Sequence, residues 1–223
     1  QSAVQKDPNL VESRKILVKI YLRAEEWSDA RKHLEALTKK FPRELGYWKD
    51  LAECYAAQKD PRKLAEADRH IVQLDRKDVK SRIRLARYLQ GTKDLQGAYD
   101  LYKAVSLLEA KNADVLQNLF EIAGKLGKKP EAIVYAKKYL ALRPKDAERH
   151  VALGDLEYAQ KNWSGALSAY RAALKVDPGI KGDFYKRYAD VVLKKGEQAE
   201  VIKALTALIK RGDADISAYT TLG

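Results

Sequence analysis

The chain has 223 residues, 46% of them hydrophobic and 33% charged, and 43 lysines and arginines against 31 acids give a formal net charge of +12. This composition excludes a disordered polypeptide, and apolar runs of four or five residues are too short for a transmembrane helix. The single cysteine, Cys54, excludes an intrachain disulfide framework. It does not decide between the cytoplasm and a bacterial periplasm or cell envelope.

Prolines mark the chain at regular intervals. Pro8 and Pro42 are 34 residues apart, Pro144 follows 102 residues later, and Pro178 follows after another 34. Because 102 is three times 34, one period accounts for all four prolines. A fixed period of 34 residues predicts an array of helix–turn–helix units.

The period divides most of the chain into six repeats. Residues 1–10 then correspond to the tail of an earlier repeat's second helix, and 216–223 to the start of a truncated seventh repeat. We therefore expect one continuous domain that is a piece of a longer array. The six repeats are 11–44, 45–78, 79–112, 113–146, 147–180 and 182–215.

Each repeat carries two helical patterns. In the first, apolar or small residues at repeat positions 4, 7, 8 and 11 share one helical stripe, as do Trp48, Leu51, Ala52 and Tyr55 in the second repeat. In the second pattern a small residue at position 20 lets the two helices approach closely. Four repeats have alanine there: Ala30, Ala98, Ala132 and Ala166. Three departures predict locally altered packing: Leu64 at position 20, Phe120 at position 8 and Glu157 at position 11.

The turns agree with these helices. Pro61 and Pro130 are placed where second helices begin, since proline costs little at the first helical position. Asp60, Asp94 and Asn162 are expected to be N-caps. At position 15, Gly127 and Gly196 are expected to adopt the left-handed conformation between the two helices.

The residues of 147–180 resemble the tetratricopeptide repeat family most clearly, through Leu153, Gly154, Trp163, Ala166, Tyr170, Ala173 and Asp177-Pro178. The resemblance covers almost the entire chain. It implies an all-α fold, a right-handed α-solenoid (superhelix) of stacked antiparallel helix hairpins. It also implies that the first helices line a concave groove for a peptide or a partner protein.

Positions 5, 9 and 12 of each first helix, with their neighbours, are expected on that concave face. The first three repeats place mainly lysine and arginine there, whereas the later ones add acids, so the groove could orient a partner by charge. The expected partner-binding residues are Lys15, Lys19, Arg23, Lys49, Glu53, Arg84, Arg87, Asn118, Glu121, Asp155 and Tyr158.

No arrangement of residues in the sequence indicates catalysis. His33, His70 and His150 have no second histidine or cysteine at metal-ligand spacing, and no activating base accompanies Cys54. We therefore predict neither an enzyme nor a bound cofactor or metal.

The predicted function is a non-catalytic scaffold for a protein or peptide ligand, including one with acidic segments. The first alternative is a self-associating module that forms homo-oligomers through its uncapped ends or convex face. The second is a basic binder of nucleic acid or anionic surfaces. Nucleic acid is the weaker alternative, because the basic residues are interleaved with acids and no aromatic platform for bases accompanies them.

Overall fold

The computed structural model describes residues 8–180, 182–196, 202 and 206, and every regular element in this part of the chain is an α-helix. The chain forms two compact units, residues 1–110 and 111–223. None of the helices in the described ranges combines the length and apolar character needed to cross a bilayer.

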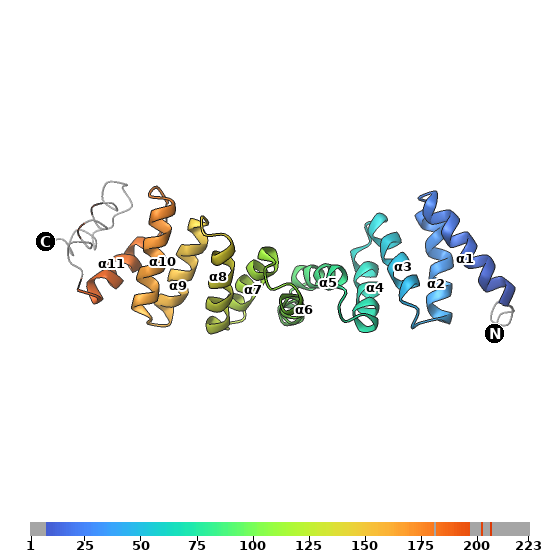
Figure 1. Ribbon diagram of the computed structural model, residues 1–223, viewed down its shortest axis with the longest axis horizontal. Coiled ribbons are helices and arrows are strands. Elements are labelled where there is room, and N and C mark those ends of the chain that lie inside the picture. Colours follow the sequence, from blue (N-terminus) through green and yellow to red (C-terminus); the bar gives the residue numbers. More distant parts are fainter. Residues whose placement is uncertain (1–7, 181, 197–201, 203–205, 207–223) are drawn as a thin grey trace. The chain divides into compact units, whose positions relative to one another are not determined.

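Unit 1 contains three consecutive helix hairpins (Figure 1). The two helices of each hairpin pack against one another, and the hairpins stack through α2 against α3 and α4 against α5. The helices are α1 (Pro8–Arg23), α2 (Trp27–Lys40), α3 (Leu45–Ala57), α4 (Pro61–Leu74), α5 (Val79–Gly91) and α6 (Leu95–Leu108).

Unit 2 repeats this arrangement. Its first two hairpins stack through α8 against α9, and α11 packs against both helices of the hairpin before it. The described helices are α7 (Ala113–Lys125), α8 (Lys129–Leu142), α9 (Ala147–Ala159), α10 (Trp163–Val176) and α11 (Phe184–Lys194). The all-α fold and the succession of stacked antiparallel hairpins are thus as predicted.

Small residues allow the close packing inside each hairpin. The four alanines at position 20 are all fully buried. In the second repeat Leu64 is only half-buried, and Ala65 beside it is the small buried residue. Gly154 of α9 faces Tyr170 of α10 so closely that a Cβ atom at residue 154 would lie 2.4 Å from the tyrosine ring. The small–large pairing therefore sets the spacing of this hairpin.

The buried glutamate at position 11 is compensated by polar partners. Glu157 of α9 is 3% exposed, and the ammonium group of Lys137 on α8 lies 2.7 Å from its carboxylate. The side-chain amide of Asn162 donates a hydrogen bond to the same carboxylate at 2.7 Å. Glu157, which replaces the usual apolar residue at position 11, therefore makes a polar contact between neighbouring hairpins.

The predicted caps are confirmed. The side chains of Asp60, Asp94 and Asn162 each accept a hydrogen bond from a backbone N–H in the first turn of α4, α6 and α10. Pro61 begins α4, and Pro130 is the second residue of α8. Gly127 and Gly196 both have φ of +72°, as expected for the turn between two helices.

The first helix begins earlier than the repeat boundary suggested. Residues 8–10, assigned from the sequence to the tail of an earlier helix, lie in α1. Pro8 can start this helix because the first helical residue needs no N–H partner. The predicted end of the sixth repeat and the predicted seventh repeat lie outside the described residues, apart from residues 202 and 206.

Candidate partner-binding surface

The expected partner-binding residues of unit 1 lie on its three first helices. Lys15, Lys19 and Arg23 are on α1, Lys49 and Glu53 on α3, and Arg84 and Arg87 on α5. Lys19, Arg23, Glu53 and Arg87 are exposed. Lys49 is exposed as well, and Lys15 and Arg84 are half-buried.

Two lysines of the set already have acidic neighbours. The ammonium group of Lys15 lies 2.7 Å from the carboxylate of Glu12. That of Lys49 lies 2.9 Å from Asp78, and the hydrogen bond between them is the largest of the effects that raise the pKa of Lys49. Asp78 also caps α5 through the N–H of Ser81, so Lys49 links α3 to the start of the next first helix.

Arg84 holds a buried carboxylate rather than facing solvent. Its guanidinium donates two hydrogen bonds to Asp68 of α4, whose side chain is completely buried. The hydrogen bonds that Arg84 donates to Asp68 are the largest cause of the raised pKa of Arg84. The sequence analysis did not identify Asp68 as the partner of Arg84. An aspartate at position 24, where other repeats have Tyr102 and Tyr170, was the feature that could have indicated it.

In unit 2 the expected acids at position 9 form ion pairs with the next first helix. Glu121 of α7 lies 2.8 Å from the guanidinium of Arg149 on α9. Asp155 of α9 accepts two hydrogen bonds from Arg187 of α11, at 2.7 and 2.9 Å, and a third from the hydroxyl of Tyr170 at 2.7 Å. The acids are therefore largely neutralised within the protein.

Tyr158 and Asn118 also have internal partners. The hydroxyl of Tyr158 donates to Asp190 at 2.7 Å, and this hydrogen bond is the first cause of the raised pKa of the tyrosine. Lys194 bonds to the same aspartate, and its ammonium group lies 4.4 Å from the ring centroid of Trp163. Asn118 donates to the backbone oxygen of Asp114 in its own helix at 2.8 Å.

A pocket of about 410 Å³ opens between α7 and α9. It brings together Glu121 and Asp155 from the expected set, but most of its lining is apolar. Phe120 is buried and lies beneath the guanidinium of Arg149, 5.8 Å from ring centroid to guanidinium carbon. The lining residues are Phe120, Glu121, Gly124, Lys125, Arg149, Ala152, Asp155 and Leu156.

Two small residues, one on each helix, leave room for the pocket. Gly124 is exposed, and a Cβ atom added to it would meet no atom within 4 Å. Ala152 stands on the opposite helix. Phe120 and Arg149 were not recognised as site residues in the sequence. The feature that could have indicated the pocket was Phe120 itself, an aromatic residue at position 8, where most repeats have a small one.

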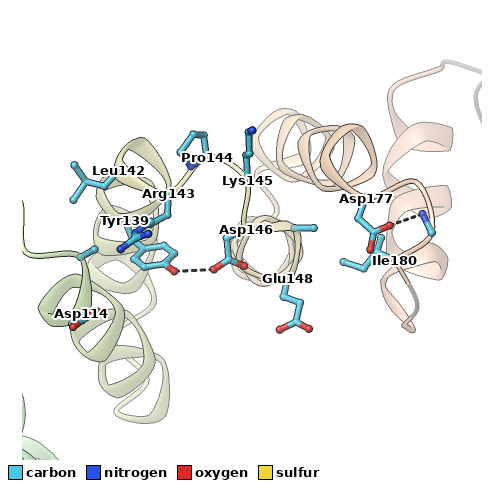
Figure 2. A pocket seen from close by; sticks show the side chains of 13 residues that line it. Asp114, Tyr139, Leu142, Arg143, Pro144, Lys145, Asp146, Glu148, Asp177 and Ile180 are labelled. Carbon is cyan, nitrogen blue, oxygen red and sulfur yellow. Dashed lines mark hydrogen bonds between the residues drawn. The ribbon is translucent and has the colours of Figure 1, made fainter.

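A larger cavity of about 1090 Å³ lies at the ends of the helices of unit 2 (Figure 2). It is bounded by the first residues of α7 and α9, the end of α8 and the loop after α10. Leu142, Pro144 and Ile180 give it apolar surface. Tyr139 closes one side by donating a hydrogen bond of 2.8 Å to Asp146, the N-cap of α9.

Cys54 and His33 are titratable residues outside these surfaces whose pKa values are shifted by burial. Cys54 is fully buried, and burial, followed by the charges of Asp50 and Glu53, raises the pKa of its thiol to about 11. Burial also lowers the pKa of His33, which stacks on Tyr21. Within the described ranges, no three His, Cys, Asp or Glu side chains are grouped so that they could hold a metal ion.

Comparison with known proteins agrees with this architecture. The sequence model described as "Tetratricopeptide repeat" matches residues 17–79, 118–180 and 151–216. No curated protein sequence matches significantly.

Three solved structures illustrate the likeness of fold. YrrB, described as a TPR protein with an unusual peptide-binding site, is 15% identical, covers 84% of this chain and 96% of its own, and superposes with a TM-score of 0.62. MamA AMB-1 is 20% identical, with coverages of 80% and 97% and a TM-score of 0.58. PilF of Pseudomonas aeruginosa is 16% identical, with coverages of 95% and 97% and a TM-score of 0.51.

In each unit the hairpins stack in succession and the first helices have residues exposed to solvent, which defines a helical-repeat scaffold for protein interactions. More specifically, the chain belongs to the tetratricopeptide repeat family, because the family's sequence model matches well over half of its length.

Proposed function

We propose that the chain is a non-catalytic scaffold that holds a peptide, or an exposed segment of a partner protein, in a concave groove lined by the solvent-exposed faces of its first helices, within a larger protein assembly. The pocket between α7 and α9 is the observation that carries this proposal. The pocket is concave and mainly apolar. It lies between the face of α7 that bears Glu121 and the face of α9 that bears Asp155. Such pockets admit side chains of a binding partner.

The ion pairs of the carboxylates around the pocket support a role in binding a ligand rather than in catalysing a reaction. Glu121 and Asp155 are engaged by arginines, so neither carboxylate is available as a base in the structure. The ion pairs instead fix the two walls of the pocket before a partner arrives. A preformed surface loses less conformational entropy on binding.

Likeness to YrrB gives the proposal a second support. That protein is described as having a peptide-binding site, and its fold superposes on most of this chain. By analogy, we propose that a peptide is the ligand here as well.

Unit 1 offers a different surface. Lys19 and Arg23 are exposed on α1, and Arg87 is exposed on α5. These cations would attract acidic segments of a partner. Because Arg84 is held by Asp68, we propose that Lys19, Arg23 and Arg87 are the residues that make these contacts.

The proposal is tested by photo-crosslinking and mass spectrometry. A photoreactive amino acid introduced at Gly124 or Lys19 is expected to capture discrete partner peptides from an extract of the source cells. The same amino acid at Lys103, which is exposed on the second helix α6, is the matched control. Equal capture from all three positions, or from Lys103 alone, would contradict a first-helix binding surface.

Self-association is a second candidate, favoured by an apolar face on α1. Ile16 and Ile20 are 58% and 54% exposed, whereas Cys54 and Ile122, which occupy the same repeat position as Ile20, are fully buried. Light scattering over a concentration series tests this candidate. If the face joins two copies, the wild-type chain gains mass with concentration and the double variant Ile16→Lys, Ile20→Lys does not.

A further inference from the structure

The pocket between α7 and α9 has an apolar interior, and the two acids on its rim are ion-paired. Phe120, Gly124 and Leu156 provide the interior. On the rim, Glu121 is paired with Arg149 across the two helices at 2.8 Å. A charged group entering here would have to compete with an existing ion pair, whereas an apolar group removes apolar surface from water at no such cost.

The same helical stripe continues to two carboxylates that have no ion pair within the described part of the chain. Asp114, Glu121 and Gly124 on α7 are separated by seven and three residues, so they share one face of that helix. Glu148 and Asp155 are likewise seven residues apart on α9. Asp114 and Glu148 are both exposed at the beginnings of their helices.

These two carboxylates line the larger cavity of unit 2 on one side. Figure 2 shows Glu148 pointing away from Lys145, which lies with Pro144 at the opposite side of the cavity. Lys125 lies at the far end of α7 from Asp114. Charged residues of the cavity lining are four acids, Asp114, Asp146, Glu148 and Asp177, against two cations, Arg143 and Lys145. The cavity is therefore acidic in balance, on a chain whose net charge is +12.

The spacing between the two features is set by helix geometry. The apolar pocket residues of α7, Phe120 and Gly124, are six and ten positions after Asp114, and a helix rises 1.5 Å per residue. The apolar pocket and the carboxylates are thus about 9–15 Å apart. An extended peptide covers about 3.3–3.6 Å per residue, so about four residues span this distance.

We infer that the α7–α9 stripe binds an extended segment that places an apolar side chain in the pocket and a lysine or arginine about four residues away, between Asp114 and Glu148. This inference rests on the proposed function and specifies its ligand. The segment runs from the pocket toward the beginnings of α7 and α9, because its cationic residue is attracted there and repelled by Lys125 at the other end. The expected ligand of unit 2 is therefore basic and apolar, in contrast to the acidic segments proposed for unit 1.

The test is selection from a display library of random dodecapeptides on the intact chain, followed by fluorescence anisotropy of the selected peptides. We expect enrichment of an apolar residue with lysine or arginine three to five positions away. Replacing that apolar residue by alanine should weaken binding about tenfold or more, as expected for exposing one buried side chain. Replacing the cation by glutamate should weaken it about threefold to tenfold at low salt and less at high salt.

Two sets of protein variants separate the contacts. Gly124→Leu fills the pocket from an exposed helical position that has room for a side chain, and it should abolish binding of the selected peptides. Gly91→Leu is the matched control, since Gly91 is also a helical glycine with nothing near its Cβ position, but on α5. Asp114→Asn and Glu148→Gln should weaken binding and flatten its salt dependence, and circular dichroism checks that every variant remains helical.

The outcomes distinguish the inference from the proposed function. Peptides whose binding is abolished by Gly124→Leu but that carry acids at the four-residue spacing would overturn the inference while leaving peptide binding in place. A selection in which every peptide binds Gly124→Leu as tightly as the wild type would do the same. A library from which no peptide is retained would overturn both.

Discussion

The contact between Gly154 and Tyr170 shows how a single hydrogen atom can set the distance between two helices. Tyr170 is fully buried, and its hydroxyl is fixed by a hydrogen bond of 2.7 Å to Asp155. The ring therefore cannot move aside without breaking that bond. Any side chain at residue 154 must push α9 and α10 apart.

We predict that Gly154→Ala lowers the free energy of unfolding by about 1–3 kcal/mol, the usual cost of overpacking a core. Urea unfolding followed by circular dichroism measures the change. Gly124→Ala is the matched control because its added methyl group meets no atom, and it should raise stability by up to about 1 kcal/mol through helix propensity. A Gly154→Ala protein as stable as the Gly124→Ala protein would show that the hairpin can separate at little cost.

Cys54 gives a pH dependence whose sign follows from its burial. The pKa of the folded-state thiol, about 11, is above the ordinary value of 9.0. As the pH rises above 9, the unfolded chain loses the thiol proton first, so ionisation favours unfolding increasingly up to about pH 11. We predict that iodoacetamide modifies the native protein slowly at pH 9 and rapidly in denaturant, as followed by mass spectrometry.

The matched variant Cys54→Ala isolates this effect. Tyrosines and lysines also titrate at high pH, but they are common to both proteins. The difference in urea midpoint between wild type and Cys54→Ala should therefore change between pH 8.5 and 10.5, with the wild type losing more stability. A constant difference would mean that the thiol is not protected by the fold.

At the scale of the helical element, in each of the six repeats the described turn after the first helix has one left-handed residue at position 15. Glycine occupies it in two repeats, but Glu25, Lys59, Lys93 and Lys161 have φ between 56° and 67° in the others. Residues with a Cβ atom adopt this conformation at a cost of roughly 1–2 kcal/mol. Stacking of the neighbouring helices must offset that cost in four turns.

We predict that Lys59→Gly, Lys93→Gly and Lys161→Gly each raise the free energy of unfolding by up to about 1 kcal/mol, less than the full strain because glycine also gains entropy when unfolded. The reverse change Gly127→Lys should destabilise by a similar amount. Thermal unfolding of the four single variants provides the measurement. Destabilisation by all three glycine substitutions would mean that lysine is not strained at this position.

These turns also show what the repeat period could and could not predict. Gly127 and Gly196 were recognisable because glycine is the usual left-handed residue, and the period places the other four residues at the same position. The ion pairs at position 9 were not predictable in the same way. Glu121 pairs with position 3 of the next repeat and Asp155 with position 6, so the partners depend on how each pair of first helices packs rather than on a fixed spacing.

For the whole molecule, the fold followed from the sequence because it is built from local contacts. Apolar stripes repeated every 34 residues define both helices of each described hairpin, and within each unit every hairpin packs on its chain neighbours. The candidate site was only partly predictable. The stripe carrying Glu121 and Asp155 could be identified from helical periodicity, but the pocket depends on the room left by Gly124 and Ala152 beside Phe120, which is a property of two packed helices.

Because contacts are mainly between neighbouring hairpins, we can predict which helices lose stability when one interface is weakened. Arg84→Ala removes the partner of the fully buried Asp68 at the interface between α4 and α5. Breaking a buried ion pair on one side costs about 3–5 kcal/mol, because a charge is left without compensation. In the double variant Asp68→Leu, Arg84→Met no charge remains buried, and most of this stability should return.

Hydrogen exchange measured by mass spectrometry should locate the effect of Arg84→Ala. In a repeat array each hairpin is stabilised mainly by its immediate neighbours. Exchange should therefore accelerate most in α3–α6 and less in α1, which among the described helices of unit 1 packs mainly against α2. Equal acceleration in all six helices of unit 1 would instead show that the unit opens as one cooperative block, and the nearest-neighbour description would be wrong for it.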